Sequence, residues 1–370
     1  MIWTIVIFIA VLSLLVFVHE LGHFATAKLL GISVEEFGFG FPPRIFGVKF
    51  KDTIYSLNWI PLGGFVKIKG EAGENSRDRD SFASRGTGAR ALVIGAGVTM
   101  NLLLAWMLLS AGFMLGLPQA LENLPPSARV ISTEIQVYSV LPDSPASRAG
   151  IKVGDVIAQA DSLPVADPDS FRNFTAEKEG APITLALVRS GEPLELAVTP
   201  EKLSGTDRAG IGIAVMRTGL VSYPWYIAPV QGLVTTGYLV KAIFGAFGGI
   251  IGDLFTAHKV SVDLSGPVGI AVMTAEVMEM GFLHLLQFVA LLSINLAVIN
   301  ILPFPALDGG RLFFLALERL RRRPVAARVE TMIHNIGFMI LITLVLVITA
   351  RDVLKFGDRI LGAASSIFGS

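Results

Sequence analysis

The sequence predicts a polytopic α-helical membrane protein with about four transmembrane helices, a membrane-associated β-hairpin or sheet, and an inserted extracytoplasmic β-rich domain. Hydrophobic residues make up 52% of the chain, charged residues 16%, and the mean hydropathy is +0.64, which is typical of a protein that crosses a bilayer several times. Four apolar segments approach or exceed the roughly 20 residues that cross the hydrocarbon. They are residues 2–18, 91–121, 281–307 and 331–350.

Lys and Arg residues gather in two parts of the chain. Residues 31–90 hold nine of them and residues 308–330 hold six, whereas residues 122–280 hold 11 basic and 17 acidic residues, a net charge of −6. Because Lys and Arg are enriched in cytoplasmic loops, the first two segments are expected in the cytoplasm and the third outside. Four spans then place both termini outside as well.

The run 224–252 is also apolar and carries Lys241 as its only charge. We expect it to form an amphipathic or partly membrane-embedded helix at the outer surface. A fifth crossing, the alternative, would move the basic segment 308–330 outside and separate Asp308 from His19.

The first apolar segment runs into the motif His19-Glu20-Leu21-Gly22-His23. Positions four apart share one face of a helix, so His19 and His23 can bind one metal ion with Glu20 beside its bound water. Zinc lowers the pKa of a bound water to roughly 7, and a carboxylate can then take the proton as the water attacks a carbonyl. The chain has no cysteine, which leaves zinc to nitrogen and oxygen ligands. The alternative is a chance match near the end of an ordinary anchor helix.

Residues 34–69 alternate aromatic and aliphatic residues with Gly and Pro, which predicts short strands and turns at the membrane. An unpaired strand edge near the metal could bind an extended substrate by backbone hydrogen bonds. The alternative is a structural hairpin that packs the helices together.

Residues 128–202 have β-rich patterning with polar turns. The segments 144–150 and 153–157 resemble a PDZ domain of the bacterial protease type, with Gly150 and Gly154 at turns that need positive φ. Such domains bind extended peptides or chain termini. A peptide receptor and a steric filter for trimmed substrates both remain open.

A third ligand is expected from the segment 300–310, which reads NILPFPALDGG. Pro303 and Pro305 break a helix, and irregular backbone at membrane depth is tolerated where protein or a watery cavity covers it. Asp308 can point its carboxylate at a metal, and Asn300 can form hydrogen bonds in the same cavity. The alternative makes Asp308 a helix N-cap. The remaining histidines are expected to be interfacial or hydrogen-bonded rather than ligands: His258, His284 and His334.

Together these motifs resemble the site-2 protease family of intramembrane zinc metalloproteases, and in particular its bacterial regulator-of-sigma-E protease branch. The matching strings follow one another in family order: HELGH, FGFGFPP, PLGGFVKIKGE, LSGPVGIA and NILPFPALDGG. The resemblance implies zinc held by His19, His23 and Asp308, with Glu20 as general base. It also implies that Asn300 holds the substrate or its oxyanion, and that Gly63 and Gly64 form a turn of the substrate-binding hairpin.

The resemblance also implies an organisation along the chain. We expect the first half of the membrane core over 1–121, a PDZ domain over 122–205, a linker with amphipathic or embedded helices over 206–280, and the second half of the core with a tail over 281–370. Gram-negative members of the branch that the chain resembles carry two tandem PDZ domains, whereas this chain has room for one.

The expected function is that of a zinc endopeptidase of the bacterial inner membrane, which cuts single-span membrane proteins in regulated intramembrane proteolysis. The implied partners are the lipid bilayer and a substrate such as an anti-sigma factor or a remnant signal peptide, with no nucleic acid. The site is expected toward the cytoplasm. Two alternatives are a metal-ion transporter, which predicts several ligand clusters, and a noncatalytic PDZ scaffold, which has no need of Glu20.

Overall fold

The chain forms two compact units, which are described separately. The computed structural model describes residues 2–71, 73–122, 124–189, 191–203, 208–256, 265–323 and 325–368, so that His258 lies outside the described residues. The helical unit consists of Met1–Leu109, Gly232–Glu276 and Phe288–Ser370, and the β-rich unit of Ser110–Gln231 and Val277–Gln287.

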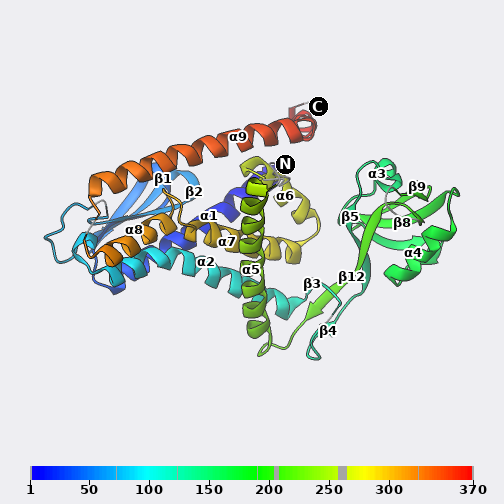
Figure 1. Ribbon diagram of the computed structural model, residues 1–370, viewed down its shortest axis with the longest axis horizontal. Helices are drawn as coiled ribbons and strands as arrows, with labels where there is room; N and C mark the ends of the chain where they lie inside the picture. Colours follow the sequence, from blue (N-terminus) through cyan, green and yellow to red (C-terminus); the bar gives the residue numbers. More distant parts are fainter. Residues whose placement is uncertain are drawn as a thin grey trace. The chain divides into compact units, whose positions relative to one another are not determined.

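Long apolar helices form most of the helical unit (Figure 1). They are α1 (Ile2–Leu29), α2 (Thr87–Leu115), α5 (Ala228–Thr256), α7 (Phe282–Ile301) and α9 (Ala327–Phe368). Among the described residues, five segments are long and apolar enough to cross a membrane: Trp3–Leu29, Thr87–Leu115, Ala228–Ile250, Phe282–Ile301 and Arg328–Gly357. The polytopic helical class is confirmed, and four of these segments overlap the four predicted spans.

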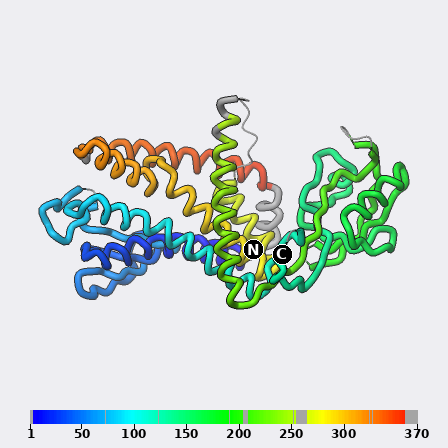
Figure 2. Tube along the Cα trace, turned by 60° about the horizontal axis from the view of Figure 1, so that its bottom comes forward, coloured from blue at the N-terminus to red at the C-terminus, as the bar shows by residue number. Residues whose placement is uncertain are grey.

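Helix α5 meets the same criterion of length and composition but differs in direction. Helices α1, α2, α7 and α9 run along a common direction, whereas α5 runs across it in both views (Figures 1 and 2). Burial does not separate α5 from the predicted spans, because 6% of the most apolar window is buried in both α5 and α9, against 44% in α2 and α7. The expectation of an embedded rather than a crossing helix over 224–252 stays a prediction. The direction of α5 across the other long helices supports it.

The core of the helical unit joins segments that are far apart in sequence. Helices α1 and α2 approach closely at Gly22, where a Cβ atom would overlap the backbone carbonyl of Ala96. One buried cluster combines residues of α1, the following sheet, α2 and α8 (Asp308–Arg321): Ala27, Ile32, Val34, Ile68, Phe82, Val93, Ile94 and Leu315. The apolar residues of these segments thus fix α1 and α2 against the sheet.

The segment after α1 forms a sheet from two long bent strands, β1 (Val34–Phe50) and β2 (Thr53–Ile68). The second half of β1 pairs with the first half of β2, with Phe50 opposite Thr53, and the first half of β1 also pairs with the end of β2, with Val34 opposite Ile68. Residues 41–50 are exposed, and several are large and apolar. The predicted membrane-associated β region is therefore present as a sheet, whose exposed apolar side chains suit contact with lipid.

The predicted helix break after α7 is confirmed. Helix α7 ends at Ile301, and α8 (Asp308–Arg321) begins after an irregular segment that contains both prolines. At Gly309 a Cβ atom would overlap the carbonyl oxygens of Ile301 and Leu302, and at Gly310 it would overlap that of Phe304. The glycine pair thus lets the start of α8 fold tightly against the end of α7.

Asp352 of α9 joins that helix to α6 (Pro267–Glu279). Its buried carboxylate accepts hydrogen bonds from the backbone N–H groups of Gly266 (2.9 Å) and Gly269 (2.7 Å), at the N-terminus of α6. A short helix, η1 (Phe82–Ser84), precedes α2.

The β-rich unit is built on a sheet with strand order β3-β12-β5-β6-β8-β9. These strands are β3 (Leu117–Ala120), β12 (Ile213–Ser222), β5 (Glu134–Val140), β6 (Val156–Ala160), β8 (Ile183–Arg189) and β9 (Glu192–Val198). Short strands β4 (Arg129–Val130) and β7 (Leu163–Pro164) pair with β12 and β6, and β10 (Glu201–Lys202) pairs with β11 (Ala209–Gly210). Helices α3 (Pro145–Ala149) and α4 (Pro168–Glu177) complete the unit.

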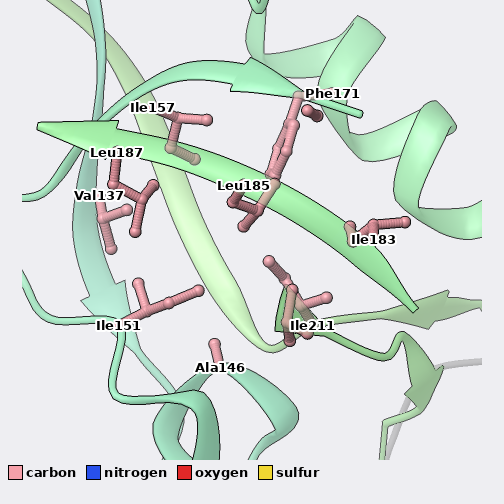
Figure 3. Close-up of a cluster of buried hydrophobic side chains, with 11 residues drawn as sticks. Val137, Ala146, Ile151, Ile157, Phe171, Ile183, Leu185, Leu187 and Ile211 are labelled. Atoms are coloured by element: carbon pink, nitrogen blue, oxygen red, sulfur yellow. The ribbon is translucent and has the colours of Figure 1, made fainter. Parts of the chain in front are cut away.

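The interior of the β-rich unit is apolar (Figure 3). Its buried core includes Val137, Ile157, Phe171, Ile183, Leu185 and Leu187. The predicted turns at Gly150 and Gly154 are confirmed, because these residues have φ angles of 83° and 95°. The boundary expected at residue 205 lies within the unit, because strand β12 pairs with both β3 and β5 beyond it.

Candidate active site

Three side chains that could hold a metal ion converge from two ends of the sequence. His19 and His23 lie one turn apart on α1, with their Nε2 atoms 3.1 Å from each other. Asp308, at the start of α8, places Oδ2 at 3.1 Å from His19 Nε2 and 3.3 Å from His23 Nε2. Both histidines are buried, at 7% and 8% exposure. The predicted ligand atoms thus form one compact cluster.

The spacing of this cluster fits zinc. Nitrogen and oxygen ligands lie about 2.0–2.1 Å from zinc, so two ligand atoms of a tetrahedral site are about 3.3 Å apart. The three measured separations have this size. In addition, Asp308 Oδ2 is buried and accepts no hydrogen bond from any residue that the structure describes. A carboxylate oxygen left in this state fits a metal ligand better than a helix cap.

Asp308 is the first residue of α8 rather than its N-cap. The N-cap is Leu307, and no side chain caps this end. The preceding irregular segment is tied to α9, because the backbone N–H of Ala306 donates to His334 Nδ1 at 2.9 Å. His334 thus has the hydrogen-bonded role that the sequence predicted, and the contact holds the segment that precedes Asp308.

Glu20 lies beside the cluster and contacts the sheet. Its Oε2 accepts a hydrogen bond from the backbone N–H of Val66 in β2, at 3.1 Å. A cavity of about 250 Å³ is lined by the three ligands, Glu20, Phe65 and Val66, among others. This cavity is the space in which a peptide could meet the metal and the carboxylate.

An ion pair separates the metal cavity from a second polar cavity. Arg311 of α8 pairs with Glu71, and both residues line the two cavities. Burial of Arg311 disfavours its charged form, but the neighbouring carboxylates, with Glu71 first among them, together raise the pKa of the guanidinium. The second cavity has a volume of about 360 Å³ and is also lined by Arg90, Glu318 and Glu330.

The second nitrogens of both ligand histidines face α2. His23 Nδ1 lies 2.8 Å from the carbonyl oxygen of Val93, and His19 Nδ1 lies 3.3 Å from the side-chain amide of Asn101. Between them, Gly97 leaves room for the imidazoles, since its Cβ atom would lie 2.5 Å from His23 Nε2 and 2.6 Å from His19 Cε1. Sequence reasoning missed these contacts. The available signal was the spacing Val93, Gly97, Asn101, which places an amide and a missing side chain on one helical face.

The other predicted site residues lie apart from the three ligands. Asn300 is half-buried near the end of α7 and is not among the described residues that line the metal cavity. Gly63 and Gly64 lie inside strand β2, where a Cβ atom at either position would meet residues of α1. A Cβ atom at Gly63 would lie 2.5 Å from Val16 Cβ, and the Gly63 N–H donates to Ser13 Oγ. Their described contacts are those of packing.

Comparison with known proteins gives one family. Residues 7–344 match the description of peptidase family M50. The chain is 37% identical to a protein of Clostridium perfringens described as a candidate zinc metalloprotease, over 92% of this chain and 96% of that protein. It is 30% identical to zinc metalloprotease RasP of Oceanobacillus iheyensis, over 95% and 98% of the two chains. It is 29% identical to regulator of sigma-W protease RasP of Bacillus subtilis, also over 95% and 98%.

Among solved structures, the PDZ domain of an SdrC-like protein from Listeria monocytogenes is similar to 24% of this chain and 92% of that domain. The identity is 20% and the TM-score 0.22.

Proposed function

The chain belongs to peptidase family M50, the zinc metalloproteases of the site-2 type, and we propose that His19, His23 and Asp308 hold its zinc while Glu20 acts as general base. One observation carries this assignment above the others. Three side chains that can bind zinc, two from α1 and one from α8, bring their ligand atoms to mutual distances of 3.1–3.3 Å. Glu20, between the two histidines in sequence, faces the same cavity.

Zinc, Glu20 and the backbone N–H of Val66 are assigned different roles in peptide hydrolysis. Zinc, when bound, supplies a Lewis acid that activates water and polarises a carbonyl. The Val66 N–H holds Oε2 of Glu20, so we assign to Oε1 the proton that leaves the attacking water and passes to the departing amine. The glutamate is thereby oriented before the substrate arrives.

The end of strand β2 is the proposed docking edge for the substrate. The Val66 N–H points to Glu20 and away from β1, while Phe65 and Val66 line the cavity. In the described part of the chain, this sheet consists of β1 and β2 alone. An unwound segment of a substrate helix can therefore add to this edge by backbone hydrogen bonds, which would bring its peptide bond beside Glu20. Asn300, Gly63 and Gly64, which are not among the described residues that line the cavity, are proposed to support the binding of the substrate from outside it.

The proposed substrates are single-span membrane proteins, such as an anti-sigma factor or a remnant signal peptide. The name of the Bacillus subtilis relative, regulator of sigma-W protease, supports the first class. In the β-rich unit, a groove of about 470 Å³ lies between α4 and the segment 208–215. This groove supports a peptide receptor, while a steric filter remains the second reading of this unit.

We propose that the β-rich unit and both termini lie outside the cytoplasm and that the metal site lies toward the cytoplasmic side. The basic segments 31–90 and 308–330 support this orientation. The direction of α5 across the other helices supports a helix along the outer membrane surface rather than a fifth crossing.

Cleavage of single-span substrates by the full-length protein in liposomes tests the assignment. Glu20→Gln is expected to retain zinc and to lower the cleavage rate at least about 100-fold, because a general base contributes roughly 10²–10⁴-fold. The matched control is Glu192→Gln, which makes the same change on strand β9 of the β-rich unit. A Glu20→Gln protein that still cuts at the wild-type rate would remove Glu20 as the base, and transport of zinc without cleavage would favour a transporter.

A further inference from the structure

One face of α2 contacts both ligand histidines. Val93, Gly97 and Asn101 are spaced four residues apart, so they lie along the same side of the helix. The first offers a backbone carbonyl to His23, the second leaves room for both rings, and the third places its amide beside His19. All three are buried.

The contact with Val93 determines which nitrogen of His23 carries the proton. A backbone carbonyl is only an acceptor, so His23 Nδ1 must donate to it over the 2.8 Å distance. In the neutral imidazole the lone pair then lies on Nε2, the atom that faces Asp308. His23 is therefore held in the tautomer that binds a metal through Nε2.

His19 needs the same tautomer, because its Nε2 also faces Asp308 and His23. Its Nδ1 must then carry a proton and find an acceptor, and Asn101 is the side chain within reach. Asn101 is fully buried, and its Oδ1 has no hydrogen-bond partner among the described residues. The amide atom that lies 3.3 Å from His19 Nδ1 is Nδ2. A half-turn of the amide places Oδ1 there instead, where it can accept the Nδ1 proton, so the number of hydrogen bonds stays the same.

We propose that Asn101 is a positioning residue for the metal site, whose amide oxygen accepts the Nδ1 proton of His19 and so turns the Nε2 lone pair toward zinc. This inference rests on the proposed ligand set of His19, His23 and Asp308. Partners of this kind behind metal-bound histidines typically change metal affinity by 10–100-fold when they are removed.

The surroundings of Asn101 hold it in place for this role. The Ser293 hydroxyl of α7 donates to the Asn101 backbone carbonyl at 2.8 Å, and both residues are buried at 0% exposure. Helix α7 also leads directly into the break before Asp308. The backbone of α2 at Asn101 is thus tied to the helix that precedes the third ligand.

Zinc affinity of the full-length protein in detergent, measured by competition with a chelator, tests the role of the amide oxygen. Asn101→Leu has a similar size and no acceptor, and it is expected to weaken zinc binding 10–100-fold. Asn101→Asp keeps an acceptor and loses the donor, so it is expected to bind zinc at least as tightly as the wild type. Thr99→Val is the control, because Thr99 lies on the exposed side of α2 and donates to Gly95.

The two Asn101 variants separate the possible results. Equal weakening in Asn101→Asp and Asn101→Leu would mean that the amide acts as a donor, which overturns the proposal, as would wild-type affinity in Asn101→Leu. The absorption spectrum of the cobalt-substituted protein should change in Asn101→Leu and stay close to wild type in Asn101→Asp. If Asn101→Leu does not fold, the affinity of Asn101→Asp still decides.

His19→Ala tests the proposed function separately. If this variant binds zinc as the wild type does, the ligand set is wrong and the inference falls with it. If it loses zinc while Asn101→Leu keeps wild-type affinity, the ligand set stands and the role of Asn101 alone is wrong.

Discussion

Around the proposed metal ligands the helical unit buries carboxylate and amide oxygens that accept no hydrogen bond from the described residues, whereas buried Asp155 of the β-rich unit is fully paired. Asp308 Oδ2 and Asn101 Oδ1 are buried without hydrogen bonds from the described residues. In the β-rich unit, buried Asp155 accepts from Arg189 at 2.7 Å with each oxygen and from the Lys152 N–H at 2.8 Å. Because buried polar groups are normally paired, the first pattern indicates a binding site and the second a structural contact.

The two units also use small and large side chains differently. In the helical unit, Gly22 lets α1 approach α2, and Gly97 leaves room for two imidazoles. The site therefore requires that these two positions carry no side chain. The β-rich unit instead fills its interior with branched and aromatic side chains (Figure 3). An added methyl group should therefore damage the helical unit, whereas removed methyl groups should damage the β-rich unit.

The largest effect is expected for Gly97→Ala. The new Cβ atom would lie 2.5 Å from His23 Nε2, which is closer than side-chain atoms approach, so the imidazoles must move away from Asp308. We expect zinc affinity to fall more than 100-fold and cleavage to disappear, since two of three ligands are displaced. Zinc content and cleavage of the purified protein measure this.

Gly95→Ala is the matched control two residues away on α2. A Cβ atom there has no neighbour within 4 Å, so zinc binding and cleavage should be unchanged. Equal losses of zinc in Gly95→Ala and Gly97→Ala would mean that any methyl group added to helix α2 disturbs zinc binding. The contact of Gly97 with the two imidazoles would then not be the cause.

A smaller effect, confined to the other unit, is expected for Leu185→Ala. Leu185 is fully buried in the core of the β-rich unit, and such truncations typically cost about 2–5 kcal/mol. The unit should unfold at lower urea concentration, reported by a fluorophore on Val153→Cys in this otherwise cysteine-free chain. Leu163→Ala removes the same atoms from an exposed strand and should have little effect. Loss of zinc in Leu185→Ala would show that the two units are coupled.

The sequence predicted the parts of the molecule that depend on local spacing. His19, Glu20 and His23 occupy one turn of a helix, and the prolines before Asp308 end a helix, so each feature could be derived from neighbouring residues. The membrane spans followed from composition for the same reason.

Features that depend on distant contacts could not be derived in this way. The polar partner of His19 is Asn101, which is 82 residues away in the sequence. The contact partner of a single Asn in an apolar helix cannot be derived from the sequence. The expected boundary at 205 falls inside a sheet of the structure, because β12 pairs with strands that precede it by many residues. Gly63 and Gly64 were assigned to a turn on the family resemblance alone, whereas in the structure they allow strand β2 to approach α1.

The smallest effect concerns acid and the β-rich unit alone. Asp167 is the N-cap of α4, and its Oδ2 accepts from the Ser170 N–H at 2.9 Å, which lowers the pKa of the carboxyl. Because the folded pKa lies below the unfolded value of about 3.9, the charged cap contributes stability above that pH and loses it as the pH falls through the folded pKa. Asp167→Asn caps the helix but does not titrate. The urea midpoint of the wild type, followed at the same Val153→Cys reporter, should therefore exceed that of Asp167→Asn near neutral pH, and the difference should shrink below about pH 4. A difference that is constant with pH would assign the contribution of Asp167 to hydrogen-bond geometry rather than to its charge.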